Sequence, residues 1–152
     1  MTEVLFYHLE HGQLETTLPS LLEKSLARDW RVVVKSGTRA CVEKLDDFLW
    51  TFADESFLPH SAVSSEQDAV NDPIWLTDAE VTGDGRNLLF LVDGATENAS
   101  TLNTYERCVV IFDGRVDEAV SEARQFWKAA SQVGCQTTYW RQSPEGRWEK
   151  QA

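Results

Sequence analysis

Apolar residues along the chain gather in two kinds of run, which predict its secondary structure. Short continuous apolar runs are typical of buried strands, whereas apolar positions repeated at i, i+3, i+4 and i+7 indicate helices with one buried face. By the first criterion the sequence predicts strands at 4–9, 31–35, 74–77, 87–92, 108–112 and 137–141. By the second it predicts helices at 14–30, 39–52 and 116–133.

The helix predicted at 116–133 has the most regular pattern and a clear end. The apolar residues on its one face are Val116, Ala119, Val120, Ala123, Phe126, Trp127, Ala130 and Val133. Gly134 follows at the position where glycine commonly ends a helix. In the helix predicted at 14–30, Pro19 indicates that the regular part begins near Thr17 or bends there, because proline lacks the N–H that the helix needs.

The order of these elements favours one class of fold. Strands and helices alternate in the first third of the chain, which favours parallel strands joined by right-handed crossovers. Residues 56–71 and 94–105 lack periodicity and are interpreted as loops, and 147–152 as a polar tail. We therefore expect a single domain over residues 1–152, an α/β fold in three layers with a largely parallel central sheet.

The net charge and the cysteines indicate which kinds of partner the protein can bind and in which cellular compartment it works. The net charge is −11 and the isoelectric point is about 4.6, so we expect no direct binding to nucleic acid, whose phosphates attract basic surfaces. Cys41, Cys108 and Cys135 lie far apart in apolar runs and are expected to be small buried hydrophobes rather than zinc ligands or disulfide partners. No signal peptide and no membrane-length apolar run is visible, which indicates a cytoplasmic protein that does not enter the membrane.

The chain offers little that predicts catalysis, a metal ion or a cofactor. The turn after the first predicted strand has one glycine and an acid, Glu10, where a phosphate-binding loop would need several glycines or a Gly-Lys pair. His8, Glu10 and His11 suggest a metal site, but three residues in one short loop supply few convergent ligands. Cys108 lies inside the apolar run 108–112, where an activated nucleophile is not expected. The outline is thus similar to nucleotide-binding folds without their phosphate loops, and we expect no cofactor, no metal and no catalytic site.

Two aromatic residues suggest an interaction surface. Phe57 lies in the loop Phe57-Leu58-Pro59-His60, and Trp50 lies seven residues earlier, near the end of the second predicted helix. Exposed aromatics in such a place mark a surface for a partner. The alternative is that both rings cover the core, because aromatic side chains dominate protein interiors.

Charged pairs at helical spacing supply a second candidate. Arg124 and Lys128 are four residues apart and share one stripe of the predicted helix, where they would anchor a carboxylate or an acidic peptide. The alternative is a solvated pair without a ligand, which is common for exposed charges. Acidic pairs such as Asp46 and Asp47 are typical of a solvated helix face.

Several segments, in order along nearly the whole chain, resemble the chi subunit of bacterial DNA polymerase III. The first two are Leu45-Asp46-Asp47-Phe48-Leu49-Trp50 and Glu55-Ser56-Phe57-Leu58-Pro59-His60. The others are Pro73-Ile74-Trp75-Leu76-Thr77, Glu106-Arg107, Ile111-Phe112-Asp113-Gly114, Ala123-Arg124, Trp127-Lys128 and Gly146-Arg147-Trp148-Glu149-Lys150. The combination of the Ser-Phe-Leu-Pro-His element with Ala-Arg-x-x-Trp-Lys is the most specific part of this resemblance.

The resemblance implies an adaptor in the replication machinery. Chi proteins connect the clamp-loader complex to single-stranded DNA-binding protein by gripping its acidic C-terminal tail, and they pair with the psi subunit or with an accessory DNA-repair helicase. By position, Arg124 and Lys128 would hold the tail and Trp127 would lie beside them. Trp50 and Phe57 would form the surface for psi or the helicase. Val120 stands where some relatives have a further basic residue.

Two functional hypotheses therefore remain. The first is a non-catalytic accessory subunit of DNA polymerase III that links the clamp loader to single-stranded DNA-binding protein. The second is a nucleotide-utilising or hydrolytic α/β enzyme, which would need a phosphate or metal cradle that the sequence motifs do not supply.

Overall fold

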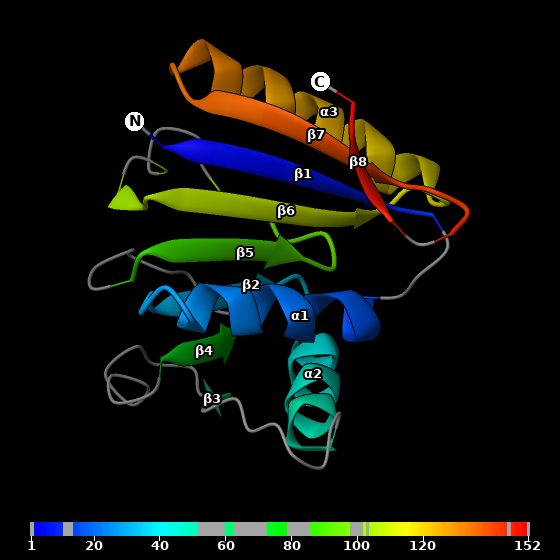
Figure 1. The fold of residues 1–152 in the computed structure, drawn as a ribbon. Helices are drawn as coiled ribbons and strands as arrows, with labels where there is room; N and C mark the ends of the chain where they lie inside the picture. Colours follow the sequence, from blue (N-terminus) through cyan, green and yellow to red (C-terminus); the bar gives the residue numbers. More distant parts are fainter. Residues whose placement is uncertain are drawn as a thin grey trace.

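The computed structural model describes residues 2–10, 14–51, 60–62, 73–78, 86–97, 102, 104–145 and 147–151. Its elements (Figure 1) are, in chain order, β1 (Glu3–Leu9), α1 (Leu14–Leu26), β2 (Val32–Ser36), α2 (Arg39–Thr51), β3 (His60–Ser61), β4 (Ile74–Thr77), β5 (Leu88–Val92), β6 (Arg107–Asp113), α3 (Asp117–Gln132), β7 (Gln136–Gln142) and β8 (Trp148–Lys150). All six predicted strands and all three predicted helices are confirmed.

The strands that the structure describes form one eight-stranded sheet in the order β3-β4-β2-β5-β6-β1-β7-β8. Every pair from β3 to β7 is parallel, and only β8 pairs antiparallel, with β7. The prediction of a largely parallel sheet is confirmed. Because β1 lies between β6 and β7, the chain's first strand ends beside two strands from its second half.

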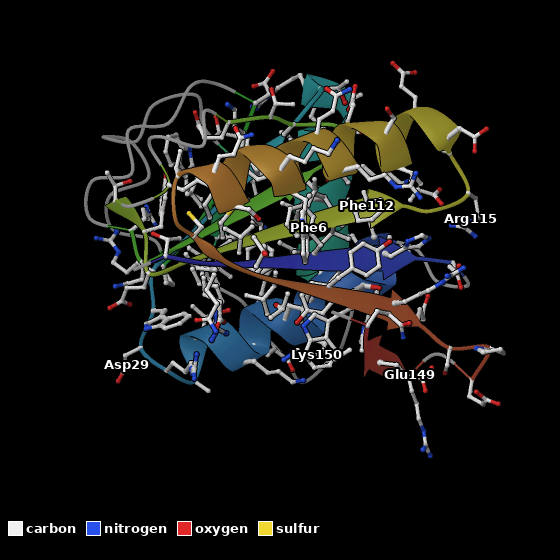
Figure 2. All side chains as sticks on the ribbon, turned by 90° about the horizontal axis from the view of Figure 1, so that it is seen from above. Phe6, Asp29, Phe112, Arg115, Glu149 and Lys150 are labelled. Carbon is white, nitrogen blue, oxygen red and sulfur yellow. The ribbon has the colours of Figure 1, made fainter. Side chains whose placement is uncertain are left out.

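Helices cover both faces of the sheet, which confirms the three layers (Figure 1). Along β1, Leu5 and Leu9 face the core under α1 and α2, whereas Val4 and Phe6 face the core under α3. Figure 2 shows Phe6 and Phe112 pointing toward α3. This alternation follows from the two-residue period of a strand, and it makes most positions of the central strands apolar.

Two segments that we predicted to be irregular contain short strands at the sheet edges. The predicted loop 56–71 contains β3, which pairs with β4, and the predicted polar tail 147–152 contains β8. Strands of two or three residues are too short to show a periodic pattern, so only their pairing partners reveal them. In β8, Trp148 also packs edge-on against Tyr7, with ring centroids 4.9 Å apart.

The helix ends differ in how well the sequence predicted them. Helix α1 begins at Leu14, as its apolar spacing predicted, with Pro19 inside it, so of the two alternatives for Pro19 the start near Thr17 was wrong. It also ends four residues earlier than predicted, before a turn in which Asp29 adopts a left-handed φ of 60°. After α3, Gly134 has a φ of 89° and bonds back to Ser131, as predicted for a glycine cap. None of the described helices is both long enough and apolar enough to cross a membrane.

Candidate functional site

Helix α3 presents opposite charges on its two flanks. Its inward stripe contains the buried Ala123 and Ala130. Arg124 and Lys128 are both exposed and share one flank, because residues four apart in a helix lie above one another. Glu118 and Glu122 occupy the other flank, where they line a cleft. The basic pair is therefore a separate, solvent-facing stripe on an acidic protein.

Trp127 lies between the basic pair and the core. Its ring is half-buried, with its centroid 5.2 Å from that of Phe6 on β1 and 6.2 Å from that of Tyr139 on β7. Most of the indole therefore holds α3 onto the sheet, and only its outer part can contribute an apolar contact beside Arg124 and Lys128. Val120, one turn before Arg124, is also half-buried.

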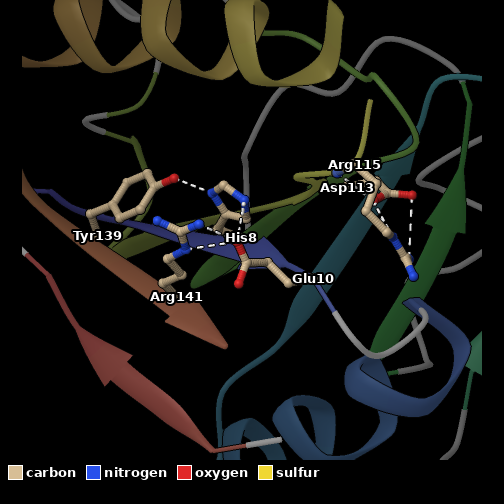
Figure 3. Close-up of polar contacts among 6 residues, drawn as sticks. All are labelled: His8, Glu10, Asp113, Arg115, Tyr139 and Arg141. Carbon is tan, nitrogen blue, oxygen red and sulfur yellow. Dashed lines mark hydrogen bonds and ion pairs between the residues drawn. The ribbon is translucent and has the colours of Figure 1, made fainter. Parts of the chain in front are cut away.

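A polar cluster at the ends of β1 and β7 lies on the face of the sheet that α3 covers (Figure 3). His8 is buried, and its Nδ1 is hydrogen-bonded to the Tyr139 hydroxyl. Arg141 Nε donates to Glu10 Oε1 at 2.7 Å, and the Nη2 group of the same guanidinium contacts the same oxygen. Glu10 Oε1 also lies 3.5 Å from His8 Nε2. Because β1 and β7 are parallel neighbours with His8 opposite Arg141, all four side chains meet at one end of the sheet.

Burial and charge shift the pKa values of this cluster. Burial lowers the pKa of His8 below its ordinary value, while Glu10 raises it and Arg141 and Arg124 lower it further. Burial raises the pKa of Tyr139, and the positive charges of Arg141 and Arg124 oppose that rise. Arg124 therefore acts electrostatically on the same two groups as Arg141.

A cleft of about 900 Å³ opens at the carboxyl ends of β5 and β6, between the first turns of α2 and α3. This is the position at which open α/β sheets usually bind ligands. Its charged lining comprises Lys44, Asp93, Asp113, Arg115, Glu118 and Glu122. Arg115 Nε donates to Asp113 Oδ1 at 2.8 Å, so that cation is already engaged by a carboxylate. With four acids and two bases among the described residues that line it, this part of the cleft is poorly suited to phosphate groups.

The described residues also give little support to metal or thiol chemistry. Within them, no group of three or more His, Cys, Asp and Glu side chains could hold a metal ion. Cys108 is fully buried, and burial raises the pKa of its thiol far above the ordinary value. Cys41 and Cys135 are partly exposed, so the expectation of a buried cysteine is confirmed for Cys108 alone. His11 lies outside the described residues.

The predicted aromatic surface falls outside the part of the chain that the structure describes: Phe57 wholly, and Trp50 by its side chain. The structure does describe a contact across that segment, in which His60 Nε2 lies 2.9 Å from Asp46 Oδ1. The His60 side chain is fully buried. Asp46, which we interpreted as part of a solvated helix face, thus partners a buried imidazole. The feature of the sequence that could have indicated this contact is His60 itself, because a buried polar ring needs a hydrogen-bond partner.

Comparison with known proteins identifies a matching family and a related protein. Residues 1–138 match the family described as DNA polymerase III chi subunit, HolC. The protein named "Probable DNA polymerase III subunit chi" from Rickettsia prowazekii (strain Madrid E) is 24% identical over 158 residues, which span 99% of this chain and 92% of the relative.

Proposed function

Because the chain belongs to the family of DNA polymerase III chi subunits, which are accessory subunits of that polymerase, we propose that it links the clamp-loader complex to single-stranded DNA-binding protein. In this proposal the acidic C-terminal tail of that protein binds the exposed flank of α3. The chain contributes binding rather than catalysis and works in the cytoplasm.

The exposed pair Arg124 and Lys128 is the observation that carries this proposal. On a chain of net charge −11, two solvent-facing cations one helical turn apart form a local attractive spot for carboxylates. The guanidinium of Arg124 offers a planar fork of N–H donors, and Lys128 adds a point charge. A tail that ends in an acidic run followed by Ile-Pro-Phe would supply carboxylates to this pair and an aromatic ring to the exposed part of Trp127.

Titration calorimetry with a synthetic tail peptide tests the proposal. We expect micromolar binding, or about 8 kcal/mol, that weakens as salt is raised, because exposed charges are screened. Arg124→Glu combined with Lys128→Glu should abolish binding. The matched control is Lys24→Glu with Arg28→Glu, which reverses two exposed cations at the same spacing near α1, on the opposite face of the sheet. The proposal fails if the α3 variant binds the peptide as tightly as the parent.

A second surface, formed by Trp50 and Phe57, would bind the psi subunit or an accessory helicase. The contact between Asp46 and His60 ties α2 to β3, the described elements that precede and follow Phe57 in the chain. Large aromatic side chains at the centre of an interface typically contribute about 2 kcal/mol or more. Phe57→Ala should therefore abolish capture of purified psi or helicase while the domain keeps its melting temperature. Loss of folding in that variant would instead place Phe57 in the core.

The competing hypothesis, a nucleotide-utilising or hydrolytic enzyme, would place its substrate in the cleft between α2 and α3. The carboxylates of Asp93, Asp113, Glu118 and Glu122 in that cleft oppose an anionic substrate. Thermal denaturation separates the two hypotheses, because a ligand that binds the folded state raises the melting temperature. We expect no rise with ATP, GTP or Mg²⁺ and a rise with the tail peptide. A rise with nucleotide and none with peptide would favour the enzyme.

A further inference from the structure

We propose that Arg141 is a third cation of the surface that binds the acidic peptide, and that Glu10 competes with the peptide for it. This inference rests on the proposed function, since the ligand is the same acidic tail. It adds a residue from another element to the site and gives the site an internal competitor.

The fold places Arg141 on the same side of the molecule as Arg124. Side chains of a strand alternate between its faces, so Tyr139 and Arg141 of β7 share one face. That face is the one under α3, because the ring of Tyr139 packs against Trp127. Helix α3 starts where β6 ends and runs back along the sheet (Figure 1), so its first half passes the end of β7 at which Arg141 lies.

Electrostatics supports this placement. Besides burial, which raises the pKa of Tyr139, the two charges that lower it are those of Arg141 and Arg124. Both arginines also lower the pKa of His8, whose pKa burial already depresses. The Tyr139 hydroxyl and His8 imidazole, joined by a hydrogen bond, thus lie within range of both guanidinium groups.

Arg141 is the residue that can extend the basic stripe beyond α3. Within α3 the only basic residues are Arg124 and Lys128, and the turn before them carries the half-buried Val120. The Arg141 side chain is 53% exposed. A guanidinium has five N–H donors. Glu10 engages the Nε and Nη2 groups through one oxygen, so other donors remain for a peptide carboxylate.

Glu10 is placed to act as the competitor. Its side chain is 23% exposed and lies between Arg141 and the buried His8 (Figure 3). A fixed carboxylate here occupies part of the Arg141 guanidinium and repels an incoming acidic chain. Ion pairs at a surface are weak, so a peptide carboxylate can share or displace this contact. The Glu10–Arg141 pair would then lower the affinity of the surface for the peptide by a modest factor.

Calorimetry with the synthetic tail peptide tests both parts of the proposal. Arg141→Gln should weaken binding about 5-fold, and Glu10→Gln should tighten it about 3-fold, as expected for single partly exposed charges. In the Arg141→Gln background, Glu10→Gln should have a smaller effect, because the competition is lost. The matched control is Glu23→Gln on the exposed side of α1, which removes the same charge on the opposite face and should leave the affinity unchanged.

The outcomes separate this inference from the function on which it rests. If Arg124→Glu with Lys128→Glu abolishes binding but Arg141→Gln binds like the parent, Arg141 is not part of the site and the proposed function stands. If Glu23→Gln tightens binding as much as Glu10→Gln, the effect is one of net charge and the competitor role is overturned. A parent that does not bind the peptide overturns both proposals. Should Arg141→Gln lower the melting temperature, Arg141→Lys keeps the positive charge without the fork. Parent-like affinity in this variant supports the role of the charge, and a loss of affinity as large as that of Arg141→Gln, at the parent's melting temperature, overturns it.

Discussion

The imidazole of His8 fills the space that a side chain on Gly114 would need. A Cβ atom added to Gly114 would lie 1.7 Å from Nε2 of His8. The ring cannot move aside freely, because its other nitrogen is hydrogen-bonded to the Tyr139 hydroxyl and the ring packs at a tilt against Phe112, with ring centroids 5.0 Å apart. Gly114 has no left-handed φ, so it is close packing, and not backbone conformation, that requires glycine here.

Gly114→Ala should therefore destabilise the protein. Forcing an extra carbon into a packed site typically lowers the free energy of unfolding by about 1–3 kcal/mol. Chemical denaturation measures this loss. In a His8→Ala background the space is vacant, and the same Gly114→Ala change should be nearly neutral. Equal losses in both backgrounds would contradict the steric explanation.

Stability should fall as the pH is lowered below about 6.5, the ordinary pKa of histidine. The folded state lowers the pKa of His8, chiefly by burial, so the unfolded chain binds a proton at a higher pH than the folded protein. The titration of His8 therefore leaves the free energy of unfolding unchanged above that pH and reduces it below that pH. Melting temperatures measured from pH 8 to pH 5 should decline less steeply in His8→Gln, which retains a side chain able to bond to Tyr139. Identical slopes for the two proteins would exclude His8 as the cause.

Asp46→Ala should destabilise the junction of α2 and β3. The change removes the 2.9 Å contact to Nε2 of the fully buried His60 ring, and the loss of a hydrogen-bond partner of a buried polar atom costs about 1–3 kcal/mol. Asp46→Asn keeps an acceptor and should retain most of the stability. Glu43→Ala, which removes a neighbouring exposed acid on α2, serves as the control. Urea denaturation compares the three, and a loss in Glu43→Ala equal to that in Asp46→Ala would rule out the specific contact.

Trp148→Ala should loosen the sheet edge that β8 closes. The Trp148 ring packs edge-on against Tyr7 from a strand of three residues, so removing it takes away the main apolar contact of β8. We expect faster hydrogen exchange at the amide of Arg147 and Gln151 and a free energy of unfolding lower by about 1–2 kcal/mol. Glu149→Ala on the same strand should change neither. Unaltered exchange in Trp148→Ala would show that backbone pairing alone holds β8.

Local patterns in the sequence determined six of the strands, the three helices and most of their buried faces; Val116 and Val133, at the two ends of the predicted apolar face of α3, are exposed. The apolar run of β6 and the spacing of Ala123, Trp127 and Ala130 on α3 depend on periods of two and of about 3.6 residues, which neighbouring residues express by themselves. The same local rule placed Arg124 and Lys128 on one exposed stripe. It also indicated the glycine cap at Gly134.

Only the tertiary structure decided which distant residues meet. His8 and Tyr139 are 131 residues apart, and they touch because β1 is inserted between β6 and β7. The contact between Glu10 and Arg141 has the same origin, as does the packing of His8 over Gly114. The order of strands in a sheet depends on how much apolar surface all helices and strands bury together. The pattern of a single segment does not reveal that total. A site made of residues from several strands can therefore be recognised only in the folded structure. A stripe of residues on one helix can be predicted from their spacing in the sequence.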